Sequence, residues 1–156
     1  MNTIHLNEII RELVGRSGLG VQVRLKTRSR DGRLIGGKYG MVSKRITMYT
    51  GVIEEQCMQM FGSLDRVEEY FTIVLAHELG HAADPELPAL SESLEDMNLT
   101  EEQRMRVALQ IEENAWNYAL ELIPEADLPM MSAIIDESLY AYRLQVEEAG
   151  AEAGIA

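Results

Sequence analysis

The segment His-Glu-Leu-Gly-His at residues 77 to 81 constrains this chain more than any other feature. Two histidines four residues apart project from one face of an α-helix, about one turn apart, which is a spacing that a single metal ion can bridge. The preceding apolar segment, residues 71 to 76, predicts that the helix is buried. Buried imidazole and carboxylate groups are costly unless they are paired. A metal ion would pair His77, Glu78 and His81, whereas the alternative is two core histidines with other partners and a surface Glu78.

Zinc is the metal that this pattern favours. A catalytic zinc ion has three protein ligands and keeps its fourth position for water, whose pKa it lowers toward about 7. His77 and His81 are the expected ligands. Glu78, directly after the first histidine, would lie beside that water and take its proton, so it is the expected catalytic base.

The third zinc ligand is expected to be Glu112. A metzincin would need Gly and His at the positions of Asp84 and Leu87, so that class is excluded. On a helix with 100° per residue, Glu112 falls at the centre of an apolar stripe, where a carboxylate needs a partner. The alternative is a Glu112 that hydrogen-bonds to another core group. Its neighbours on the stripe are Met105, Ala108, Leu109, Ala115, Trp116, Ala119 and Ile123.

Several further residues have two possible roles. Asp84 follows His77 by seven positions and could orient a histidine or cap the helix before Pro85. Tyr140 and Tyr142 could stabilise an oxyanion or pack in the core. The lone Cys57 excludes an intrachain disulfide and is expected to be a small buried apolar residue.

The order of hydrophobic patterns predicts a single α+β domain over residues 1 to 156. Helical spacing over residues 3 to 14 is followed between residues 20 and 50 by alternating patterns, which predict a small antiparallel sheet of two or three strands. The strand at residues 43 to 49 is the candidate edge for binding an extended peptide. The HELGH helix follows, then a loop over residues 85 to 98. A capping box at Thr100 and Gln103 opens a helix that runs to Ile123, and a last helix spans about residues 130 to 148.

The segments HELGHAAD and EENAWNYALELIP resemble the ImmA/IrrE-like metallopeptidases and the related minimal gluzincins. That family has a helix of the form E-x-x-A-x-x-[FY]-A-x-x-L-L that supplies the third zinc ligand, and the match places the ligand on Glu112. The resemblance covers about residues 70 to 124, with Pro124 one position earlier than in the family. It implies a zincin-like fold and a zinc-dependent endopeptidase of bacterial or phage regulatory type that cleaves a specific protein or peptide. The remaining matching positions are Ala115, Tyr118, Ala119, Leu122 and Ile123.

Charge and composition restrict the possible partners. The net charge of −12 argues against nucleic-acid binding, which needs a concentrated basic surface. The basic residues nevertheless concentrate in the strand region, which could meet an acidic substrate or form a solvated edge. We find no signal peptide or membrane-spanning segment and expect a cytoplasmic protein. The alternative to an enzyme is a zinc-stabilised module that binds a protein without turnover.

Overall fold

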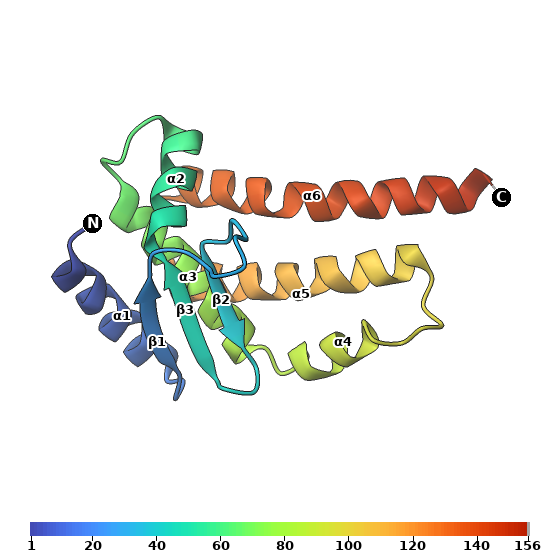
Figure 1. Cartoon of the computed structure of the whole chain (residues 1–156), viewed down its shortest axis with the longest axis horizontal. Coiled ribbons are helices and arrows are strands. Elements are labelled where there is room, and N and C mark those ends of the chain that lie inside the picture. The colour runs from blue at the N-terminus through green and yellow to red at the C-terminus, as the bar shows by residue number, and fades with distance from the viewer. Residues whose placement is uncertain (156) are drawn as a thin grey trace.

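A computed structural model describes residues 1–155 of the chain, with side chains through Glu152. The described residues form an α+β structure in which helices predominate (Figure 1). The six helices are α1 (Thr3–Ser17), α2 (Thr50–Phe61), α3 (Val67–Ala83), α4 (Leu87–Ser93), α5 (Glu101–Leu122) and α6 (Leu128–Ile155), and the three strands are β1 (Gln22–Lys26), β2 (Gly37–Gly40) and β3 (Arg45–Tyr49).

The sheet is mixed, so the prediction of an antiparallel sheet is wrong. Its strand order is β1-β3-β2, with β1 parallel and β2 antiparallel to β3. Residues 43 to 49 therefore do not form an edge: β3 has a hydrogen-bonded neighbour on each side, and β1 and β2 are the edge strands, of which β2 lies next to α3 (Figure 1). The alternating pattern could not reveal this, because alternation reports which face of a strand is buried and not which strand lies beside it.

The ends of several helices follow from local chemistry. Helix α1 continues past Gly15 and ends at Gly18, whose φ of 68° suits glycine. The predicted capping box is confirmed at the start of α5, where Thr100 and Gln103 each bond to the other's backbone N–H. The segment after α3 is not entirely the loop that its prolines predict, because residues 87 to 93 form α4. Pro88 is compatible with this helix, since it lies in the first turn, where its missing N–H costs nothing.

The core lies where α3 meets the sheet, α1 and α5. Helix α3 is buried along most of its length, and Cys57 of α2 is buried in the same cluster, as expected. Helices α5 and α6 run side by side in opposite directions and extend well beyond the sheet (Figure 1). In the part of the chain that the structure describes, no helix is long and apolar enough to cross a membrane.

The close approach of α3 and α5 depends on one glycine. A Cβ atom added at Gly80 would lie 2.3 Å from the carbonyl oxygen of Ala115, closer than any real contact. Glycine is therefore the only residue that lets the two backbones meet at this distance. The helices that carry the predicted metal ligands cross here.

Candidate metal centre

The three predicted metal ligands come together where α3 crosses α5. The Oε2 atom of Glu112 lies 2.9 Å from Nε2 of His81 and 3.3 Å from Nε2 of His77. His77 and His81 are one turn apart on α3, with ring centroids separated by 4.6 Å. His77, Glu78 and His81 also offer ligand atoms that lie within 4.8 Å of one another, so this group can hold a metal ion.

Two atoms of this cluster indicate that the residues fit a metal. Nε2 of His77 and Oε2 of Glu112 are buried, and neither has a hydrogen-bond partner among the described residues. Leaving such an atom unsatisfied costs about 1–3 kcal/mol. The 3.3 Å contact between the two does not have the orientation of a hydrogen bond. A cation with nitrogen and oxygen ligands would use both lone pairs, and imidazole and carboxylate are ligands that zinc accepts.

The electrostatics of the cluster are those of a cation site. Burial alone would lower the pKa of His77, but the carboxylates of Glu112 and Glu78 outweigh it and raise that pKa to about 9. Burial would raise the pKa of Glu112, yet His77 and His81 lower it far below the usual value. The pocket therefore stabilises positive charge between two carboxylates, whether a proton or a metal ion carries it.

Glu78 lies beside the ligand cluster and is 5% exposed. Its Oε1 is 3.4 Å from Nδ1 of His77. The edge strand β2 covers it closely, because a Cβ atom at Gly37 would lie 3.0 Å from Cγ of Glu78. A side chain at position 37 would crowd this carboxylate, a constraint that the sequence pattern did not reveal.

The two candidate tyrosines differ in their surroundings. Tyr142 reaches the site from α6, and its hydroxyl donates a 3.3 Å hydrogen bond to Oε1 of Glu112. Burial and the nearby Glu112 raise the pKa of Tyr142 to about 12, so its hydroxyl stays protonated and remains a donor. Tyr140 is 65% exposed, so it neither reaches the site nor packs in the core.

Asp84 is the C-cap residue of α3: its backbone N–H donates to the carbonyl oxygen of His81, and its side chain bonds to neither histidine ring among the described residues. Its Oδ1 accepts the backbone N–H of Glu86, and its Oδ2 accepts a hydrogen bond from the side chain of Asn114 on α5. Of the two roles considered from the sequence, the structure therefore supports the cap. This contact also ties α3 to α5 one turn beyond His81.

Trp116 is a site residue that the sequence reasoning did not select. Its ring centroid is 4.3 Å from that of His77, and its indole N–H donates to Ser138 on α6. The available signal was its position one turn after Glu112 on the same helix face. Trp116 is the only tryptophan of the chain, so it reports on this site alone.

Two clefts open onto the cluster. The larger, about 660 Å³, is lined by polar and apolar residues in similar measure, and the smaller, about 320 Å³, runs along β2 toward α4. Both are lined by Ile35, Gly37, His77, Glu78 and Glu112. An extended chain passing through both clefts would therefore lie across the candidate metal ligands.

Known proteins add no further evidence at this point. The chain matches no family model, and no curated protein or solved structure shows significant similarity to it. The assignment of a function therefore rests on the geometry of this site.

Proposed function

We propose that this protein is a zinc-dependent endopeptidase of the gluzincin type, with His77, His81 and Glu112 as zinc ligands. The observation that carries this proposal is the contact of Glu112 Oε2 with both imidazole Nε2 atoms, because two of these three atoms are buried and have no hydrogen-bond partner among residues 1 to 152. When bound there, zinc would supply Lewis-acid polarisation of a carbonyl group and acidification of water.

Glu78 is the general base of the proposed reaction. Its carboxylate accepts a proton from the attacking water as the water oxygen bonds to the scissile carbonyl carbon. The same proton then passes to the amide nitrogen as the C–N bond breaks, so Glu78 returns to its ionised form. Close packing of β2 at Gly37 holds this side chain and limits access of bulk water to it.

The proposal includes membership of the chain in the ImmA/IrrE-like peptidases or minimal gluzincins, which its motifs resemble, and the zincin-like fold of that family. It is supported by the position of Glu112, which both the helix pattern and the family motif selected and which lies against both histidines. A regulatory role in a bacterium or phage is part of the same hypothesis.

The proposed substrate is a peptide segment in extended conformation. Strand β2 is one of the two edge strands of the sheet, and its residues 37 to 39 line the smaller cleft. A peptide can add to such an edge through backbone hydrogen bonds. A peptide bound along β2 in this way would pass the site that both clefts share and bring a carbonyl group to Glu78.

The proposal is tested by metal content and cleavage in matched variants. Purified wild type and Glu78→Gln should each contain one zinc ion per chain, whereas His81→Ala should contain none. Cleavage of a mixed peptide library, followed by mass spectrometry, should be lost in both variants, and for Glu78→Gln by at least roughly 100-fold because a general base contributes this much. His5→Ala alters an exposed histidine on α1 and should change neither property.

Each outcome discriminates between functions. Zinc without cleavage by the wild type would favour the alternative, a zinc-stabilised module that binds a protein partner. Equal cleavage by Glu78→Gln and wild type would refute the mechanism. Absence of zinc from the wild type, together with no binding on titration, would refute the proposal altogether.

A further inference from the structure

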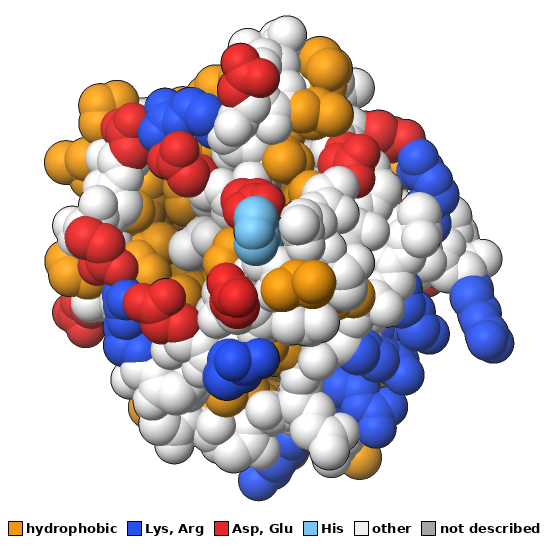
Figure 2. Space-filling model, turned by 90° about the vertical axis from the view of Figure 1, so that its left-hand side faces the viewer, with side chains coloured by type: hydrophobic (Ala, Val, Ile, Leu, Met, Phe, Trp, Pro, Cys, Tyr) orange, Lys and Arg blue, Asp and Glu red, His pale blue; other side chains and the backbone are white. Residues whose placement is uncertain are grey.

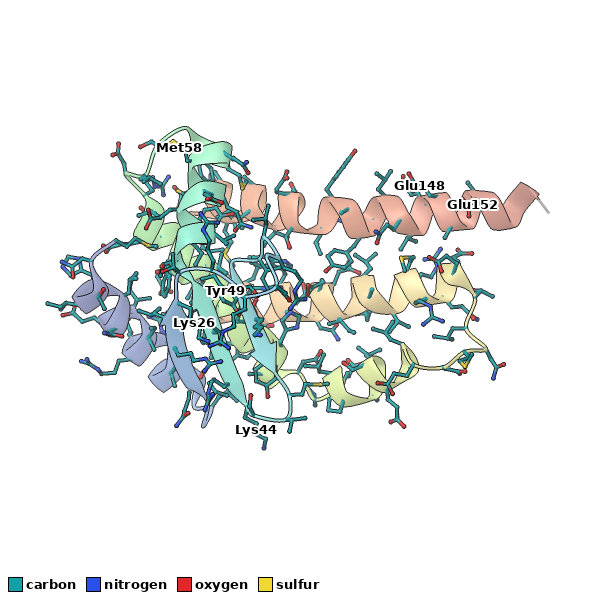
Figure 3. All side chains as sticks on the ribbon, in the orientation of Figure 1. Lys26, Lys44, Tyr49, Met58, Glu148 and Glu152 are labelled. Atoms are coloured by element: carbon teal, nitrogen blue, oxygen red, sulfur yellow. The ribbon has the colours of Figure 1, made fainter. Side chains whose placement is uncertain are left out.

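The charges of this acidic protein are segregated along the chain. Residues 1 to 49 contain ten basic and three acidic residues, whereas residues 86 to 156 contain three basic and sixteen acidic residues. In the structure, Lys26 and Lys44 lie at the sheet, and Glu148 and Glu152 lie on the distant half of α6 (Figure 3). Lys and Arg side chains gather on one side of the molecule, at the lower right of Figure 2.

The sheet concentrates this positive charge on one face. The three strands contain four basic residues and no acidic residue. Residues paired across strands share a face, so the register places all four on the side that also carries Thr47. The opposite side carries Gly37 and packs on Glu78. We call this surface the basic face, and it consists of Arg24, Lys26, Lys38 and Arg45.

The positive charge of the basic face is not neutralised within the protein. None of its four residues forms an ion pair with the described part of the chain, and Arg24 instead donates to the hydroxyl of Thr47 at 3.0 Å. The register pairs each of the four only with uncharged residues on the neighbouring strand. The chain has 26 acidic residues, and none of them lies in the three strands that carry the basic face. The absence of acidic residues from these strands favours recognition of an anionic partner.

The basic face continues into the candidate substrate cleft. Lys38 belongs to the basic face and also lines the smaller cleft, together with Arg33 from the preceding segment. Outside the metal cluster, these two are the charged residues among those that line this cleft, and Lys38 is the one without an ion pair in the described part of the chain, since Arg33 pairs with Asp31. A chain leaving the cleft along β2 would therefore pass directly onto positive charge.

From these observations we propose that the basic face binds an acidic polypeptide segment of the protein substrate, outside the bond that is cleaved. Identification of the partner as a substrate rests on the proposed function. A nucleic acid fits less well, because binding of single strands uses exposed aromatic rings. The aromatic residue on this face, Tyr49, is 2% exposed.

The acidic half of the molecule does not prevent this interaction. At physiological ionic strength, charges separated by more than about 8 Å are largely screened. The distant half of α6 lies far from the sheet (Figure 3), so a partner at the basic face meets mainly the local positive charge. An acidic segment that comes within this screening distance of the basic face would be oriented by its positive charge.

Binding of a defined probe tests this inference separately from catalysis. The probe is a fluorescein-labelled peptide of eight glutamates, titrated with zinc-loaded Glu78→Gln protein and followed by anisotropy. We expect saturable binding at low salt that weakens as sodium chloride is raised. An eight-nucleotide oligothymidine, tested in the same way, should bind more weakly than the peptide.

Two charge variants identify the surface. Lys38→Glu with Arg45→Glu should weaken peptide binding by roughly tenfold or more, since each exposed charge pair contributes up to about a factor of five. Arg106→Glu with Arg143→Glu makes the same change in net charge on α5 and α6 and should have little effect. Should the first pair disturb folding, Lys38→Gln with Arg45→Gln should still give a several-fold loss.

Three results would overturn the inference: no saturable binding of the peptide at low salt, equal weakening by both pairs of charge reversals, or tighter binding of the oligonucleotide. Failure of the proposed function is a different result. A protein that binds the acidic peptide at the basic face but cleaves no peptide would retain this inference as a binding site and lose the enzymatic proposal.

Discussion

Replacement of Gly80 by alanine tests how the candidate metal centre is built. The new Cβ atom would lie 2.3 Å from the carbonyl oxygen of Ala115, and 2.8 Å and 2.9 Å from its Cα and C atoms. An ordinary contact begins at 3.4 Å, so α3 and α5 must separate by about 1 Å. The obstacle is backbone in the middle of a helix, which cannot rotate away as a side chain could.

The expected loss of stability follows from two opposing effects. Overpacking a core costs about 1–3 kcal/mol, and a backbone obstacle favours the upper end of that range. Alanine gains about 1 kcal/mol over glycine inside a helix. The net expectation is a loss of about 2 kcal/mol, measured by urea unfolding in the presence of a chelator. Gly15→Ala in α1 is the matched control, because no other atom lies within 4 Å of its new Cβ, and it should be neutral or stabilising.

Metal binding should respond to the same substitution. Separation of the helices by about 1 Å moves Glu112 on α5 away from the histidines on α3. We therefore expect a fall in zinc affinity of roughly tenfold or more, in the range seen when groups that support metal ligands are altered. Quenching of Trp116, which lies against His77, provides the titration signal. A Gly80→Ala protein with wild-type stability and wild-type zinc affinity would refute the interpretation that Gly80 sets the spacing of the site.

Two other predictions concern the groups around the cluster. Tyr142→Phe removes the hydrogen bond to Oε1 of Glu112 and should lower zinc affinity by roughly tenfold. The melting temperature of the chelated protein should change little. Unchanged zinc affinity in a competition titration would contradict this prediction. The pKa of His77 is raised from 6.5 to about 9, against the effect of burial, by Glu112 and Glu78. Its contribution to folding is therefore complete below pH 6.5 and is lost as pH rises through about 9. Urea unfolding of chelated protein should show a falling free energy over that interval, and Glu112→Gln should flatten the fall.

Much of the candidate site could be predicted from the sequence, because the spacing of its residues along each helix is local. The i, i+4 relation of His77 and His81 and the position of Glu112 on an apolar stripe are properties of single helices. The sequence of each helix therefore indicates which of its faces is buried and which residues lie on that face. That the three side chains meet follows from one further requirement, that buried polar groups need partners.

The sheet shows where such reasoning ends. Alternation predicted the strands β1 and β3, and the sequence showed that basic residues concentrate in this region. It could not reveal that β1 and β3 are parallel neighbours, or that β2, with its two glycines, takes the edge beside the candidate site. Strand pairing is a hydrogen-bonding relation between segments distant in sequence, and each segment shows the same pattern in either orientation.

The sequence by itself determined the types of the candidate metal ligands, their helical faces and the capping box that starts α5. Only the tertiary structure decided which helix supplies the hydroxyl on Glu112, which strand borders the clefts, and why position 80 is glycine. Tyr142 and Glu112 are 30 residues apart, and Gly80 and Ala115 are 35 apart. The physical reason is that such contacts depend on how closely two packed elements approach, a quantity set by all the side chains between them and encoded in neither segment alone.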